Sequence, residues 1–289
     1  MTSLKEVKRR INTVNSTKKI TEARRMISSA KLHQCQEMGE SASRYCEALT
    51  EVMRNVLITN EMDTPLAVKN KTGKTAIVII SSNSGMCGSF NLNMTKELKH
   101  LKELHAGEEL IFYPIGKKIR EAVIQQGENI GFDEGSYWDY LAGKICFQDV
   151  EVVVNTLIEQ YLSGSLSRIL LVSYHYKSMV SQIITYTNFL PYALPSVCKD
   201  NKTDKRSLYI IEPSWEELQD GLIRVILKSI FYSVIIDNQT AEYAARTMAM
   251  QLASENANDL LQELQLAYNK LRQQNITTEL LDIVGSSFA

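Results

Sequence analysis

The sequence predicts a mixed α/β domain inserted between two long terminal helices that pair as an antiparallel two-helix coiled coil. All five prolines and ten of the thirteen glycines lie between residues 61 and 213. The flanking stretches carry apolar residues at alternating three- and four-residue spacing, which is typical of heptads. Short β-branched runs alternate with helical patterns in the middle. These observations predict an N-terminal coiled-coil helix over 1–60, a Rossmann-like α/β insert over 61–213 and a C-terminal coiled-coil helix over 214–289.

The first helix is predicted by two apolar seams. The seam residues are Leu4, Val7, Ile11 and Val14, then Met38, Ala42, Tyr45, Leu49, Val52 and Val56. Between the seams, a second apolar set is expected to continue the seam in a shifted phase: Ile20, Ala23, Ile27 and Ala30. A continuous helix here would be roughly 85 Å long, at 1.5 Å per residue.

The insert is predicted to hold a small parallel sheet covered on both faces by helices. Three buried apolar runs predict strands, over Ala76–Ser81, Glu109–Pro114 and Arg168–Tyr174. Helical patterns cover 91–105, 117–126 and 137–162. The alternating run Ser181–Phe189 predicts a half-exposed strand, and Ser207–Ile211 is its expected partner across a polar loop, 199–206.

The last helix is predicted to begin at a capping box formed by Ser214 and Glu217. Its expected seam residues are Ala241, Ala245, Met248 and Leu252, followed by Ala257, Leu261, Leu264, Tyr268 and Leu271. A single helix over this stretch would be roughly 110 Å long. Two amphipathic helices at opposite ends of the chain bury their seams most simply against each other.

Composition excludes several classes of function. Net charge is −1, so no overall field attracts nucleic acid. The sequence has no apolar run long enough to cross a membrane, and its first residues do not resemble a secretory signal. The five cysteines are far apart and form no metal-binding spacing, which favours reduced thiols, with no metal or cofactor expected. Residues 1–31 are basic and the C-terminal stretch is acidic, which favours pairing of the two helices.

One turn resembles a ligand site. The segment S-N-S-G-M-C-G, with Gly85, Cys87 and Gly88, follows a predicted strand and precedes a helix. Backbone N–H groups in such a turn can face an anion. However, the segment lacks both the G-x-G-x-x-G pattern and the P-loop pattern, so a tight strand-to-helix turn is the favoured interpretation.

Three stretches together resemble the γ subunit family of F-type rotary ATP synthases. They are R-R-I-N-T-V-N-S-T-K-K-I-T-E-A-R-R-M-I-S-S-A-K near the start, S-S-N-S-G-M-C-G-S-F-N in the insert, and E-Y-A-A-R-T-M-A-M followed by L-Q-L-A-Y-N-K-L-R-Q-Q-N-I-T-T-E-L-L-D-I-V-G near the end. The resemblance covers essentially the whole chain. No insertion of the chloroplast type follows Cys87 or precedes Pro191, which favours a bacterial origin.

The resemblance implies a rotor subunit that carries torque between a membrane ring of c subunits and a catalytic head of α and β subunits. Such a subunit is not itself an enzyme. It would lie at the cytoplasmic side of the bacterial plasma (inner) membrane, attached indirectly through the c-ring. Residues at the family's head-contact positions are Lys18, Lys19, Arg24, Arg25, Arg246, Arg272, Gln273 and Thr277. Arg206 and Tyr209 fall in the region implied to face the ε subunit and the c-ring.

Two alternatives belong to other classes of protein. A nucleotide-dependent α/β enzyme with a helical arm would need phosphate contacts at the turn 85–88. A coiled-coil tether or adaptor outside any motor would tolerate charge reversal at Arg246 and Arg272.

Overall fold

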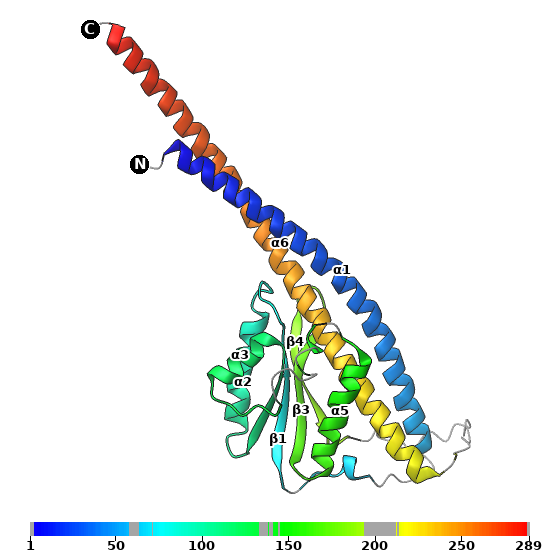
Figure 1. Cartoon of the computed structure of the whole chain (residues 1–289). Coiled ribbons are helices and arrows are strands. Elements are labelled where there is room, and N and C mark those ends of the chain that lie inside the picture. Colours follow the sequence, from blue (N-terminus) through cyan, green and yellow to red (C-terminus); the bar gives the residue numbers. More distant parts are fainter. Residues whose placement is uncertain are drawn as a thin grey trace. The chain divides into compact units, whose positions relative to one another are not determined.

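A computed structural model describes residues 3–57, 64–70, 72–132, 138, 141–143, 145–193, 212 and 214–287. The chain forms two compact units, which we call the coil unit (residues 1–30 and 246–289) and the sheet unit (residues 31–245). Two long helices, α1 (Leu4–Leu57) and α6 (Trp215–Ser287), contribute to both units, which confirms the predicted terminal helices (Figure 1). The Ser214 hydroxyl accepts a hydrogen bond from the Glu217 N–H at 3.3 Å, as a helix N-cap does.

The sheet has four strands in the order β2-β1-β3-β4. Their bounds are β1 (Lys74–Ile80), β2 (Leu110–Ile115), β3 (Leu166–Tyr176) and β4 (Gln182–Leu190). β1 runs parallel to β2 and β3, and β4 is antiparallel to β3. All four strands therefore match predicted runs. The expected fifth strand, Ser207–Ile211, lies outside the described residues, as does the loop before it.

The helices of the insert are α2 (Phe90–Leu104), α3 (Lys117–Gln125) and α5 (Phe147–Leu162), with a 3-10 turn η1 at Pro65–Ala67. The helix predicted over 137–162 is interrupted: Trp138 and Leu141 are helical, but the helix does not continue from there to Phe147. Ala142 and Gly143 lie in a turn and a bend, and Cys146 has an extended backbone, with φ −119° and ψ 134°. The last helical stretch therefore begins only at Phe147.

The two faces of the sheet bury different helices, because successive strand side chains point to opposite faces. On one face, Ile77 and Ile79 of β1 lie in a buried cluster with residues of α2 and α3. On the other face, Val78 and Ile80 lie in a cluster with residues of α5 and α6. α6 supplies five fully buried members of that second cluster: Ile223, Ile226, Leu227, Phe231 and Ile235. The first part of α6 is thus a core helix of the sheet unit, which the coiled-coil interpretation did not predict.

Within the sheet unit, α1 and α6 are antiparallel. Lys31 Nζ lies 5.5 Å from the centroid of the Tyr243 ring, and Cys35 Sγ lies 3.9 Å from Gln239 Oε1. The later residue of α1, Cys35, thus contacts the earlier residue of α6, Gln239, as expected for antiparallel helices. Burial raises the pKa of the Cys35 thiol to about 11, so this thiol stays protonated and unreactive at neutral pH.

Two predicted seam positions of α1 are wrong in this unit. Tyr45 is 52% exposed and Val52 is 37% exposed, whereas the next residues, Cys46 and Met53, turn inward. From Ala42 the inward positions step by four, three, four and three residues, in the opposite order to the predicted seam, so Ala42, Leu49 and Val56 are confirmed and Cys46 and Met53 replace Tyr45 and Val52.

Candidate interaction surface of the coil unit

The coil unit pairs the first part of α1 with the last part of α6, which lie side by side in Figure 1. Ser254 Oγ donates a hydrogen bond to Glu22 Oε1 at 3.4 Å across the pair. Inward-facing positions of α1 recur in unbroken heptad steps, at Leu4, Val7, Ile11, Val14, Lys18, Thr21, Arg25 and Ser28. Those of α6 are Thr247, Met250, Ser254, Ala257, Leu261, Leu264, Tyr268 and Leu271. The second half of the predicted α6 seam is therefore confirmed.

The first half of the predicted α6 seam is partly wrong. Leu252 is 55% exposed, because Met250 and Ser254 occupy the inward positions on either side of it. Ala241 is fully buried, but in the sheet unit, where it joins the cluster on the α2 and α3 face.

The predicted phase shift in α1 does not occur. Ile20 is 60% exposed and Ile27 is 59% exposed, and Ala23 and Ala30 are exposed with them. The heptad simply continues past Val14 with polar residues at its inward positions, since a helix changes phase only where residues are inserted into the repeat. The chain therefore has a polar section of seam and, on another face of the same helix, an exposed apolar stripe made of Ile20, Ala23, Ile27 and Ala30.

Because Val7 faces inward and Ile27 lies on the exposed stripe, the same kind of substitution should have different effects on stability at the two positions. Val7→Ser, at a position only 4% exposed, should lower the free energy of unfolding by about 2 kcal/mol, because it buries a hydroxyl and leaves a void. Ile27→Ser should change it by less than about 0.5 kcal/mol. Urea unfolding of the full chain followed by circular dichroism checks both. Equal losses at the two positions would contradict the exposed stripe.

The basic residues singled out in the first helix have different surroundings. Lys18 lies at an inward position, with its side chain 26% exposed and its Nζ 3.6 Å from Glu22 Oε1. Arg25 also lies on the seam, while Lys19 and Arg24 are exposed. The exposed side chains of Lys19 and Arg24 are therefore accessible to a partner.

The predicted contact residues of α6 occupy two levels. Arg246 is only 7% exposed, beside the buried Thr247. Arg272, Gln273 and Thr277 are exposed, roughly 40 Å farther along the helix at 1.5 Å per residue. Thr277 Oγ1 donates to the Gln273 carbonyl at 2.9 Å, which places both on one side of the helix.

Beyond Leu271, α6 is exposed on all sides in the part of the coil unit that the structure describes. Four of its last apolar side chains are more than half exposed: Leu280, Leu281, Ile283 and Val284. A helix end that is apolar yet exposed is typical of a surface that another protein covers.

The other two predicted contact residues, Arg206 and Tyr209, lie outside the described residues. They remain a prediction.

The turn at Gly85–Gly88 is filled by its own side chains. Asn91 Oδ1 accepts hydrogen bonds from Ser81 Oγ at 2.7 Å and from Ser82 Oγ at 2.8 Å. Asn91 Nδ2 lies 3.2 Å from Cys87 Sγ. Asn91 Oδ1 also accepts from the Ser82 backbone N–H at 3.4 Å, so two hydroxyls and one backbone donor beside the turn already have a partner within the protein. This favours the tight-turn interpretation over phosphate binding.

A glycine just after β2, Gly116, lies very close to the backbone that follows β1. Gly116 has φ +109°, and a Cβ there would lie 2.6 Å from the Ser81 carbonyl oxygen. Gly116→Ala should therefore lower the free energy of unfolding by about 3 kcal/mol, from backbone strain and the clash. Gly127→Ala is a control, because its φ is also positive, at +71°, but nothing lies near the added Cβ. Thermal unfolding of both variants should show the larger loss at Gly116.

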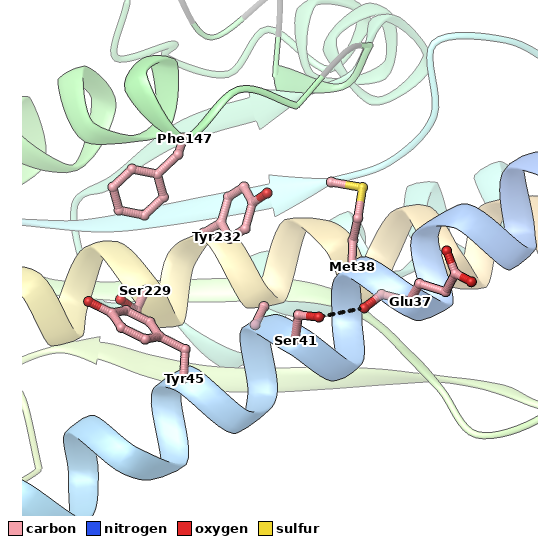
Figure 2. A pocket seen from close by; sticks show the side chains of 8 residues that line it. Glu37, Met38, Ser41, Tyr45, Phe147, Ser229 and Tyr232 are labelled. Carbon is pink, nitrogen blue, oxygen red and sulfur yellow. Dashed lines mark hydrogen bonds between the residues drawn. The ribbon is translucent and has the colours of Figure 1, made fainter.

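An open cavity of about 580 Å³ lies among α1, α5 and α6 of the sheet unit (Figure 2). Its aromatic residues are Tyr45, Phe147 and Tyr232, and the rings of the last two meet edge to face at 5.5 Å. Ser41 Oγ donates to the Glu37 carbonyl at 3.0 Å, so its proton is already used in the helix. The residues that line this cavity form no nucleophile–base pair of the kind that covalent catalysis needs.

Among the described residues, no group of three or more His, Cys, Asp or Glu side chains could hold a metal ion. None of the helices with described residues is both long and apolar enough to cross a membrane.

The whole chain matches a known family. The family model described as ATP synthase matches residues 3–289. The chain belongs to the ATP synthase family. Curated members similar to it are the ATP synthase gamma chain of Bacteroides fragilis, 41% identical over the full length of both chains, and that of Parabacteroides distasonis, 39% identical over 99% of each.

Solved structures related to the ATP synthase family share the fold. A chain of the Euglena gracilis mitochondrial ATP synthase, in a structure of OSCP, F1 and the c-ring, aligns with a TM-score of 0.67 at 20% identity. That alignment covers 99% of this chain and 93% of the other. A chain from the central stalk and c-ring of the Tetrahymena thermophila mitochondrial enzyme aligns with a TM-score of 0.57 at 17% identity, over 81% of this chain and 99% of the other.

Proposed function

We propose that this chain is the central-stalk rotor subunit of a bacterial F-type ATP synthase. It transmits torque between a membrane-embedded c-ring and the catalytic sites of a head built from α and β subunits, so that proton flow drives ATP synthesis. The chemistry takes place in the head, and this chain is not itself catalytic. Full-length similarity to chains named ATP synthase gamma chain is the observation that carries the proposal.

The coil unit supports this role physically. A paired helix resists bending better than a single one, and heptads run through the pair from Leu4 to Ser28. Two helices have no three-fold symmetry, so such a rod presents a different face to each of three surrounding catalytic sites as it turns. The exposed residues Lys19, Arg24, Arg272, Gln273 and Thr277 are the proposed contacts with the head.

The chain is also proposed to contact the ε subunit and the c-ring. Arg206 and Tyr209 are proposed contacts with the ε subunit and the c-ring. Through them the chain would be held at the cytoplasmic side of the bacterial plasma membrane as a peripheral subunit. It binds no nucleic acid in this proposal and needs no cofactor.

Co-expression with the α and β subunits of the same bacterium tests the proposal. An affinity tag on β should retrieve this chain in a complex that hydrolyses ATP, whereas the chain alone should bind no nucleotide in equilibrium dialysis. A chain that stays outside the complex, or that binds nucleotide tightly by itself, would favour one of the two alternatives instead.

A further inference from the structure

The end of β3 extends beyond its neighbour β1. β3 pairs with β1 only as far as Val172, opposite Ile79, but it pairs with β4 as far as Tyr176, opposite Gln182. Along its last residues β3 therefore has a strand on one side only. Backbone N–H groups that lose a strand partner in a folded protein need another acceptor.

Two adjacent side chains of α6 supply these acceptors. Asn238 Oδ1 accepts a hydrogen bond from the Tyr174 N–H at 3.0 Å, and Asp237 Oδ1 accepts one from the Tyr176 N–H at 3.0 Å. The second oxygen of Asp237, Oδ2, lies 2.6 Å from His175 Nδ1. Three consecutive residues of the strand are thus bound by two consecutive residues of the helix.

Two nearby hydrogen bonds tie α6 and the end of β3 to other parts of the sheet unit. Gln239 Nε2 donates to the Gly143 carbonyl at 3.0 Å, in the segment before α5. From α1, Gln36 Nε2 donates to the Tyr176 hydroxyl at 3.1 Å. Asn238 is 1% exposed. Asp and Asn are poor formers of a helix interior, so their side-chain bonds, and not helix propensity, account for them in the middle of α6.

Hydrogen bonds differ from apolar packing in how they respond to twist. Burial of apolar surface is non-directional: the buried side chains of α6 resist displacement through close packing, but packing prescribes no bond angle. Hydrogen bonds weaken steeply as their angle departs from linear. The bonds of Asp237 and Asn238 therefore add to the packing a directional constraint on the angle of α6 about its own axis relative to the sheet.

We propose that Asp237 and Asn238 form the joint through which torque passes between the sheet and α6. This inference rests on the proposed rotor function. They are positioning residues, because they touch neither nucleotide nor the transported ion. With the joint intact, rotation of the sheet turns α6 by the same angle. Without it, part of the rotation is absorbed as slip or twist whenever the rotor works against a load.

The test uses the complete membrane-bound complex with the double variant D237A/N238A. ATP hydrolysis in membranes made leaky to protons should stay within about two-fold of wild type. Proton pumping against an imposed pH gradient should fall by about ten-fold. The ratio of pumping to hydrolysis is the decisive quantity, because a variant that is merely less stable lowers both rates together.

Two further variants sharpen the test. D237N keeps an oxygen that can accept from the Tyr176 N–H, so its ratio should stay close to wild type and above that of D237A. D220A is the matched control, because Asp220 is on the same helix and its partner among the described residues is Arg224, in an i,i+4 ion pair of 2.9 Å. If the double variant does not assemble, D237A and N238A are measured singly by the same ratio.

The outcomes separate the joint from the rotor function itself. A wild-type ratio in D237A/N238A, or in both single variants, would overturn the joint while leaving the rotor proposal intact. Absence of coupled pumping in wild type and D220A alike would instead remove the rotor proposal.

Discussion

Charge reversal at Arg272 is expected to reduce ATP-driven proton pumping by at least ten-fold. Arg272 is exposed just beyond the last seam residue of α6, Leu271, so reversal of its charge costs the isolated chain little stability. In the proposed complex, its guanidinium can form charge-assisted hydrogen bonds with the head, and Arg is prominent among residues that dominate interfaces. Ten-fold corresponds to about 1.4 kcal/mol, less than such contacts commonly contribute.

The matched control is Lys270→Glu. Lys270 is also exposed, lies two residues away on the same helix and undergoes the same change of charge. Residues two apart on a helix do not share a face. Pumping by inverted membrane vesicles should be lost in R272E and largely kept in K270E. Equal pumping in the two variants would place the head contact elsewhere and favour the tether interpretation.

Truncation of Phe231 is expected to have the largest effect on stability. This α6 residue is fully buried against the sheet, and its ring meets that of Phe189 edge to face at 5.6 Å. Phe231→Ala should lower the free energy of unfolding by about 3–5 kcal/mol, from lost burial and the cavity left behind. Unfolding in guanidinium can be followed by tryptophan fluorescence, because Trp138 belongs to the same buried cluster.

Leu266→Ala provides the comparison for Phe231→Ala. Leu266 lies on the same helix but is 71% exposed, so its truncation should change the free energy of unfolding by less than about 0.5 kcal/mol. A loss at Phe231 no greater than that at Leu266 would show that α6 is not part of the sheet unit's core.

The sequence was sufficient for the elements with strong local periodicity. Apolar β-branched runs predicted β1 and β3, because strands buried on both faces are usually near-continuous runs of Val, Ile and Leu. Heptads predicted both long helices for the same local reason. The start of α5 could not be predicted, because the helical spacing of apolar residues over 137–162 does not reveal the extended backbone at Cys146.

The partner of each apolar stripe was harder to predict than the stripe itself. Ile223, Phe231 and Ile235 have ordinary helical spacing, which does not distinguish a coiled-coil partner from a sheet. In α1, the apolar residues Ile20 and Ile27 are exposed, whereas the inward residues Thr21 and Ser28 are polar, so apolar periodicity does not identify them. Heptad steps counted from Val14 do lead to Thr21 and Ser28.

The candidate site could be predicted only through its resemblance to a family. No charge pattern in the sequence separates Arg272, which is exposed, from Arg246, which is buried, and the two need different tests. The joint at Asp237 and Asn238 depends on where β3 ends relative to β1, which is a tertiary feature without a local signal.

Rotation itself is the most direct test of the rotor account. A complex fixed to a surface through its β subunits, with a bead attached to an engineered cysteine at the exposed Gly107, should turn stepwise and in one direction when ATP is added. Continued ATP hydrolysis by an intact complex whose bead shows no directed rotation would contradict the account.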